Sequence, residues 1–269
     1  MSRSQSSTAW KVILGVLAAL LVIILAAEAG ARWFLADQMK SGFEEEAIAA
    51  GANIEEEAEV SFGAYPLVLG LMQRKLPEME MTVPSTLSIE GTTVRGNPAS
   101  TIKVEDMSLS DEPVAERMTA TTEFPDDFIR ALLQGQLEQT AESEDGFGFL
   151  TKLFEISDVT ANHSSGTFDI ALSNGYVPNL FLLELRPVMV DGSLTFEATS
   201  GALVGFDIPQ EWVDHLTQVL QEGMEQEVTG DMRIQEFTVI PDGFRMTITG
   251  ENVPLKDVAN SSVTQQQAL

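Results

Sequence analysis

The chain has 269 residues, of which 44% are hydrophobic and 21% charged, so it can bury one sizeable core and is neither disordered nor fibrous in composition. Its formal charge at pH 7 is −26, and the part after residue 27 carries 41 acidic against 13 basic side chains, a balance of −28. Because nucleic-acid binding depends on Lys and Arg, this balance argues against a nucleic-acid partner. The absence of cysteine excludes disulfides, thiolate metal sites and a cysteine nucleophile.

The first predicted element is an apolar leader. Residues 12–27 contain no polar side chain, Arg3 and Lys11 precede them, and every acidic residue of the chain follows them. Because the positively charged side of such a segment stays in the cytoplasm, residues 12–27 are expected to meet the cytoplasmic membrane and residues 31–269 to lie on its outer, periplasmic side.

Residues 1–30 allow two interpretations. Sixteen apolar residues are slightly short for a transmembrane helix, but small and apolar residues continue the segment, and Trp33 and Phe34 would suit the outer interface of a retained anchor. Alternatively, Ala27-Glu28-Ala29 offers a small-x-small cleavage site, and cleavage would release the domain into the periplasm. Either interpretation exports the remainder of the chain.

The exported part is predicted to be mostly β. Helical spacing extends the leader helix to about residue 50, and alternating apolar and acidic residues then predict antiparallel strands, beginning with residues 57–62 and 78–83. In two strands, at residues 102–109 and 232–239, the alternation slips by one residue, which predicts bulges and a strongly curved sheet. The same alternation recurs around residues 87–89, 118–122, 168–172, 181–185 and 244–248.

Two helices interrupt the strands. They open at Pro125 and Pro209, where the first turn of a helix tolerates the missing N–H, and each is followed by a strand, a turn and a strand. This order indicates either a helix-plus-hairpin unit used twice or a chance similarity of amphipathic helices. The predicted fold class is α+β, with a strongly curved antiparallel sheet wrapped around helices.

The usual signatures of catalysis are missing from the sequence. No glycine-rich phosphate loop occurs, and neither His163 nor His215 has a partner at metal-ligand spacing, so neither a metal nor another cofactor is predicted. The two carboxylates of a glycoside hydrolase need not be close in sequence, so a glycolipid hydrolase stays open as an alternative. A scaffold that binds another envelope protein is a further alternative, whose protein partner the sequence does not identify.

The least ordinary segment is residues 62–77, which we call the hook. It places seven apolar residues between Tyr65 and Met72, followed by Arg74 and Lys75, the only adjacent basic pair of the exported part. Two interpretations stay open: a short helical turn that lies across a sheet, or a lipid-facing rim with the two cations near a phosphate.

The hook also carries a resemblance. The passage from Val60 to Val83, with its Phe-x-x-x-Pro-Leu hook, the strand at residues 87–91 and the strand at residues 102–109 resemble the LmeA-like phospholipid-binding proteins of the actinobacterial cell envelope. The resemblance implies an envelope location, binding of phospholipids including phosphoinositides, and a role in making or maintaining lipomannan and lipoarabinomannan. It also implies a tubular lipid-binding architecture, and it supplies no catalytic residue.

We therefore expect noncatalytic phospholipid binding. Each CH₂ removed from water contributes about 0.8 kcal/mol, so the acyl chains should dominate the affinity. Arg74 and Lys75 are the headgroup candidates. The candidate lipid-binding residues lie in the hook and on the two helices: Phe62, Tyr65, Leu67, Leu69, Leu71, Met72, Phe128, Leu132, Trp212 and Leu216.

Overall fold

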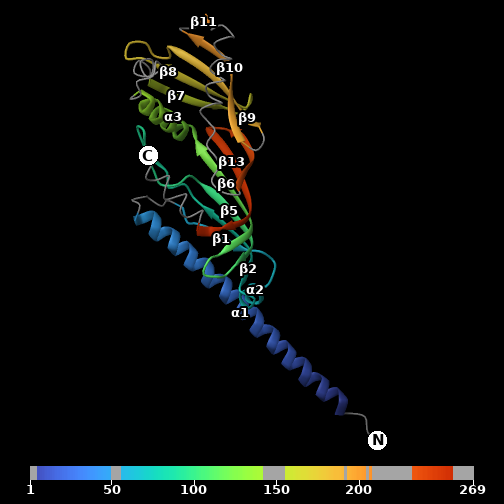
Figure 1. The fold of residues 1–269 in the computed structure, drawn as a ribbon. Helices are drawn as coiled ribbons and strands as arrows, with labels where there is room; N and C mark the ends of the chain where they lie inside the picture. Colours follow the sequence, from blue (N-terminus) through green and yellow to red (C-terminus); the bar gives the residue numbers. More distant parts are fainter. Residues whose placement is uncertain are drawn as a thin grey trace.

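The computed structural model describes residues 5–49, 56–141, 155–190, 193–203, 206–207 and 232–256. The molecule is elongated: helix α1 projects from one end, and a five-stranded sheet lies at the other (Figure 1). The helix predicted to open at Pro209, which would carry Trp212, His215 and Leu216, lies outside the described residues.

Helix α1 (Gln5–Ala49) is continuous for 45 residues, about 68 Å at 1.5 Å per residue. It is long and apolar enough to cross a membrane, and its side chains from Leu17 to Leu25 are exposed. The second half of α1 behaves differently, since Ala31, Leu35 and Met39 pack against a buried core of the domain. The predicted extension of the leader helix to about residue 50 is confirmed.

A six-stranded antiparallel sheet, the large sheet, forms the middle of the molecule. It contains the first and the last strands of the described domain, because β12 and β13 return to this sheet and β13 pairs with β6. Helix α2 (Leu67–Met72) connects the first two strands, and β3 (Ser88–Glu90) and β4 (Thr93–Arg95) form a separate hairpin. The strand order is β1 (Glu59–Phe62), β2 (Lys75–Val83), β5 (Ser100–Ser108), β6 (Val114–Pro125), β13 (Gly243–Pro254) and β12 (Met232–Ile240).

A second antiparallel sheet follows helix α3 (Asp126–Ala141), which begins directly where β6 ends and packs on β7. Two acidic residues stand in the first turn of α3, where the positive end of the helix dipole favours them. The strand order of this second sheet is β11 (Phe206–Asp207), β10 (Ser193–Leu203), β9 (Phe181–Val190), β8 (Thr167–Ser173) and β7 (Glu155–Asn162).

Two cores hold these layers together. The proximal core joins α1 and α2 to the large sheet, and Leu67, Met79 and Val104 are buried in it. The distal core joins the second sheet to α3 and to the hairpin of β12 and β13, with Phe168 and Val239 at its centre. Stacked phenylalanine rings extend the distal core along the large sheet.

The α+β class with antiparallel sheets is confirmed, and the described strands form open sheets rather than a closed barrel. A predicted bulge is present in β12, where the register with β13 shifts between Ile234 and Glu236. The predicted bulge in β5 is absent, because the pairing with β2 keeps the same register throughout. The alternation of apolar side chains in β5 changes instead at Asp106, whose backbone has a φ of +49°. Of the first proposed helix-plus-hairpin unit, the structure describes α3 and the hairpin of β7 and β8; the helix of the second unit lies outside the described residues.

Candidate functional site

One face of the large sheet carries an unbroken row of apolar side chains. Residues paired across neighbouring strands point to the same face, so the strand pairing defines the row directly. All six of its members are half-buried. The apolar row consists of Val60 on β1, Met81 on β2, Ile102 on β5, Ala120 on β6, Ile248 on β13 and Ile234 on β12.

The opposite face of the same sheet is polar. Thr82 and Thr101 pair through their hydroxyl oxygens at 3.2 Å, and Thr121 and Thr247 do so at 3.1 Å. Ion pairs join the strands on this face, and hydrogen bonds from Lys103 to Glu78 and Glu105 raise the pKa of Lys103. The large sheet therefore presents a solvated face and an apolar face to different surroundings.

The apolar row lies between the two cores, and its members Val60 and Ile102 also pack against the proximal core. On one side of it, the next row of the same face contains Phe62, Met79 and Val104, which belong to the proximal core under α1. On the other side, Phe124 stacks on Phe244 with ring centroids 4.7 Å apart, in contact with the distal core under α3. Both helices thus pack on the face that carries the apolar row, one at each end.

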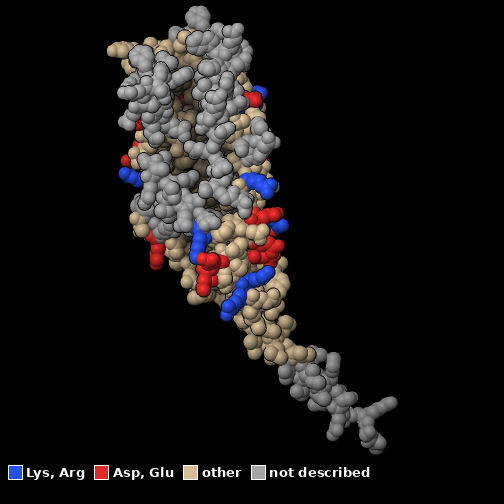
Figure 2. Space-filling view, in the orientation of Figure 1, with Lys and Arg blue, Asp and Glu red and all other residues tan. Residues whose placement is uncertain are grey.

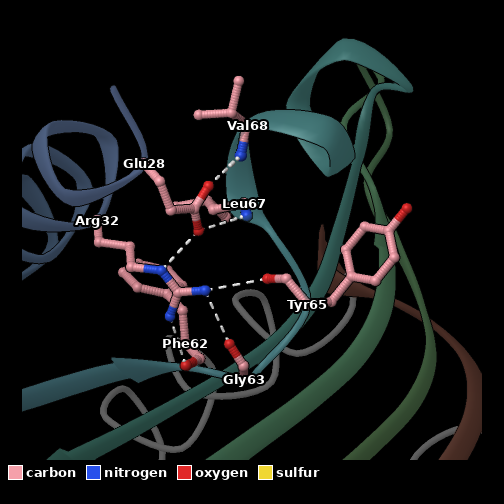
Figure 3. A network of polar contacts seen from close by, with 7 residues as sticks. All are labelled: Glu28, Arg32, Phe62, Gly63, Tyr65, Leu67 and Val68. Atoms are coloured by element: carbon pink, nitrogen blue, oxygen red, sulfur yellow. Dashed lines mark hydrogen bonds and ion pairs between the residues drawn. The ribbon is translucent and has the colours of Figure 1, made fainter. Parts of the chain in front are cut away.

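At the proximal end, two side chains of α1 fasten the hook (Figure 3). The carboxylate of Glu28 accepts hydrogen bonds from the backbone N–H groups of Leu67, at 2.7 Å, and Val68, at 3.0 Å. These are the first N–H groups of α2, which have no partner within the helix, and Pro66 before them supplies no side-chain cap. Glu28 therefore caps α2 from another helix.

Arg32 completes this arrangement, which we call the Glu28–Arg32 clamp. Its guanidinium donates to the backbone oxygens of Phe62 and Gly63, both at 2.9 Å, and of Tyr65 at 3.0 Å. Its Nε also donates to Glu28 Oε1 at 2.6 Å, so the two side chains orient each other. The guanidinium and carboxylate together hold the backbone on both sides of the turn into α2 (Figure 3).

The structure brings most of the predicted hook residues together but gives them different surroundings. Leu67 is buried, and Phe62 and Leu71 are half-buried in the proximal core. Tyr65, Leu69 and Met72 are instead exposed, with Met72 at 78%. The hook is thus a short helix that packs across the sheet and also presents an exposed apolar edge.

The other predicted lipid contacts lie at the opposite end of the apolar face. Phe128 and Leu132 are half-buried on α3, and the Phe128 ring lies 4.9 Å from that of Phe124. The structure therefore does not gather them with the hook residues at one place. It puts the two groups on the two sides of the apolar row.

The headgroup candidates occupy the turn after α2. Arg74 and Lys75 are exposed, and within the described part of the chain neither forms an ion pair. Lys75 lines a polar depression of about 360 Å³, whose other lining residues include Asp106, Glu116 and Glu251. The carboxylates around Lys75 leave Arg74 as the better placed cation for an anionic headgroup.

A family model described as LmeA-like phospholipid-binding matches residues 26–253 of this chain. The chain belongs to the LmeA-like phospholipid-binding family. The matched region contains the Glu28–Arg32 clamp, the hook and the whole apolar row. Comparisons with curated proteins and with solved structures find no match.

In this LmeA-like chain, sequence reasoning missed the clamp. The local sequence indicates Glu28 only as part of a cleavage site, although Glu28 is the first acidic residue of the chain and Arg32 follows it at the i,i+4 spacing of a helical ion pair. That spacing was a usable signal for an ion pair. The partners of the pair, at residues 62–68, come from a distant segment and leave no local pattern.

The carboxylates of this LmeA-like fold bear on the alternative of a glycolipid hydrolase. Asp169 lies opposite Glu184 on the second sheet, on the face turned away from the distal core. Burial and the charge of Glu184 raise the pKa of Asp169, while a hydrogen bond from the Ser200 hydroxyl lowers the pKa of Glu184.

Nδ1 of His163 lies 2.8 Å from the backbone oxygen of Val239. In the described ranges, no three His, Cys, Asp or Glu side chains are grouped to hold a metal.

Proposed function

We propose that this chain is a noncatalytic phospholipid-binding protein, and that the acyl chains of the lipid lie along the apolar row of the large sheet. Membership of the phospholipid-binding family supports the ligand class. The observation that carries the location is the row itself, a line of half-buried apolar side chains between two cores. A lipid chain laid along the row would complete the burial that the two flanking helices begin.

The energetics favour the acyl chains as the main binding element. Removing apolar surface from water contributes about 0.8 kcal/mol for each CH₂, so two long chains can contribute more than the headgroup contacts. The exported part has a balance of −28, and it gains nothing from long-range attraction to an anionic lipid. Any preference for an anionic headgroup therefore depends on a local cation, for which Arg74 is our candidate.

We further propose that α1 is a retained anchor. A cut after Ala29 would remove Glu28, and the N–H groups of Leu67 and Val68 would lose their acceptor. The helix is also continuous through the candidate cleavage site. The intact mass of the membrane-bound protein tests this proposal: we expect the mass of the uncleaved chain, and a mass lacking residues 1–29 would contradict it.

The cellular location that we propose is supported by the leader and by the family. With Arg3 and Lys11 on the cytoplasmic side, residues 31–269 form an exported domain on the outer side of the membrane. The resemblance noted in the sequence supports a phosphoinositide ligand, a strongly curved, tubular form of the sheet, and a role in making or maintaining lipomannan and lipoarabinomannan. These features complete the proposal and have their own tests in lipid analysis and lipoglycan profiling of a deletion strain.

Native mass spectrometry of the full chain, purified in mild detergent, tests the lipid-binding proposal. We expect a stoichiometric, co-purifying phospholipid. A protein that is empty and also ignores added phospholipid would overturn the proposal.

A pair of neighbouring substitutions locates the lipid. Met81→Gln places an amide in the apolar row, whereas Thr82→Gln places the same side chain on the polar face of the same strand. We expect Met81→Gln to lower lipid occupancy several-fold and Thr82→Gln to leave it unchanged, with thermal unfolding of both variants as the check on folding. Equal occupancy in two folded variants would place the lipid elsewhere.

A further inference from the structure

The relation between the hook and the membrane follows from where the clamp sits on α1. The apolar leader ends at residue 27, and Glu28 and Arg32 stand in the next two turns of the same helix. From residue 12 to Phe34 the helix rises about 33 Å, a little more than the hydrocarbon thickness of about 30 Å. Residues 28–34 therefore lie at the level where hydrocarbon gives way to headgroups.

The clamp fixes α2 at that same level. Five hydrogen bonds join the side chains of Glu28 and Arg32 to the backbone between Phe62 and Val68, with lengths from 2.7 to 3.0 Å. Figure 3 shows both side chains reaching from α1 to the start of α2. Since the clamp binds backbone groups on both sides of the turn, α2 cannot change its height without breaking it.

The surface held at this level differs from the rest of the protein. Residues 29–36 and 60–77 contain no acidic residue, in a chain that otherwise has 41. The apolar side chains here are exposed: Trp33 at 69% and Phe34 at 59% on α1, with Leu69 at 46% and Met72 at 78% on α2. The part of α1 that projects below the domain carries neither acidic nor basic side chains where it is described (Figure 2). The exposed edge of α2 thus continues the apolar surface of α1.

We infer that α2 is an interfacial helix, held by the Glu28–Arg32 clamp so that Leu69 and Met72 insert into the outer surface of the bilayer that α1 crosses. Amphipathic side chains such as Trp33 and Tyr65 suit the same layer, and Arg74 faces the lipid phosphates there. A bilayer is the occupant because the apolar edge is continuous with the membrane helix. This inference rests on α1 remaining in the membrane, and not on lipid being held by the apolar row.

The chain has no cysteine, so single cysteines can be introduced for labelling without background. We would attach a polarity-sensitive fluorophore at Met72→Cys and, as a matched control, at Tyr176→Cys, which is 95% exposed and belongs to the connection of β8 and β9 in the second sheet. The full chain is placed in vesicles of phosphatidylcholine and phosphatidylglycerol that contain spin-labelled lipid. Both sites are exposed, so neither substitution removes a buried side chain.

We expect spin-labelled lipid to quench the label at position 72 several-fold more strongly than the label at position 176. Equal quenching at the two sites would overturn the inference. Adding Glu28→Ala and Arg32→Ala to Met72→Cys should expose the label to a water-soluble quencher, and unchanged protection would overturn the role of the clamp. Intact mass and co-purified lipid are read on the same sample, so cleavage of α1 or an empty apolar row is recognised separately.

Discussion

The backbone of Arg74 has a φ of +56°, the left-handed conformation that commonly ends a helix and that glycine adopts with least strain. Its N–H donates to the oxygen of Leu71, and its own oxygen accepts from Leu109, so both neighbouring segments hold it in this conformation. A charged residue at a position that favours glycine indicates that the side chain has a use there.

We predict that Arg74→Gly leaves the free energy of unfolding unchanged or raises it by up to about 1 kcal/mol, because the strain of the left-handed conformation is removed. Gln73→Gly is the matched control: its φ is −88°, and the added freedom of glycine should cost about 0.5–1 kcal/mol. Chemical denaturation of the detergent-solubilised chain measures both. A larger loss in Arg74→Gly than in Gln73→Gly would contradict the prediction.

Asp126, at the start of α3, is a half-buried carboxylate with one satisfied oxygen. Oδ2 accepts the N–H of Ala161 at 3.1 Å, while Oδ1 is buried without a hydrogen-bond partner among the described residues. Burial raises the pKa of Asp126 above its ordinary value of 3.8, and the charge of Asp242 adds to the effect. The protonated form is thus favoured in the folded state, so the stability linked to this group is present below pH 3.8 and lost as the pH rises through the raised pKa.

We therefore predict that Asp126→Asn, which keeps an acceptor for Ala161 and has no charge, melts at a higher temperature than the natural chain at neutral pH. The difference should shrink as the pH falls toward 3.8. Asp127→Asn, at an exposed neighbouring position, should show no such gain. Thermal unfolding followed across this pH range is the measurement, and a gain that is the same at every pH would contradict the stated cause.

At the scale of single residues, the sequence indicated which side chains are apolar and near the hook, but not how each is used. Leu67 and Met72 are both apolar and are five residues apart, yet Leu67 is buried and Met72 is the most exposed of the large apolar side chains of the hook. The difference arises because Glu28 fixes the first turn of α2 against the sheet. That contact spans 39 residues of sequence and has no local signature.

Among the elements, β12 shows how a bulge accommodates one extra residue and keeps the rest of the strand in the core. Ile234 faces the apolar row, and after the bulge at Gln235 the strand again turns Phe237 and Val239 to the same face. If Gln235 were instead paired one-to-one with β13, the second half of β12 would point its apolar side chains to the polar face of the sheet. The bulge therefore joins the apolar row to the distal core.

Deleting Gln235 should remove the bulge and leave Ile234, Glu236 and Phe237 opposite their present partners on β13, so we expect the free energy of unfolding to change by at most about 1 kcal/mol. The side chain of Gln235 is exposed, so Gln235→Ala should have little effect. Urea denaturation of the two variants compares these costs. A loss of about 3–5 kcal/mol in the deletion variant alone, the cost typical of removing a large aromatic side chain from a core, would show that Phe237 has left the distal core.

Periodicity in the sequence was sufficient to predict β1, β2 and the hairpin of β12 and β13, because a half-buried strand must alternate apolar and polar side chains. It also predicted the bulge in β12. The slip in β5 had another origin, since Asp106 turns the chain locally while the pairing with β2 keeps its register. A change of alternation alone does not distinguish these two causes.

For the whole molecule, the strand order lay beyond sequence reasoning. Strand β13 pairs with β6, more than a hundred residues earlier in the chain, and so completes the sheet whose first strand follows α1. Such pairing depends on which apolar faces can share a core, and many strands of this chain have similar patterns. The apolar row is a product of that order, so it too could not be predicted from sequence.

The division of α1 into a leader and a packed half predicts how truncations behave. A chain that begins at Glu28 keeps the clamp and the core contacts of Ala31, Leu35 and Met39, so we expect it to fold. A chain that begins at residue 50 loses these contacts, exposes the proximal core and should aggregate. Size-exclusion chromatography with circular dichroism separates the two outcomes, and a monomeric, folded product lacking residues 1–49 would contradict this account.

Because α1 runs without interruption from the leader to the proximal core, it has no hinge at the membrane surface. If α1 is retained in the bilayer, as we propose, the tilt of the helix is therefore also the tilt of the domain. Helices respond to a thinner bilayer by tilting further. On this chain, such tilting would swing the large sheet toward the lipid surface, so the thickness of the surrounding membrane sets the reach of the domain above it.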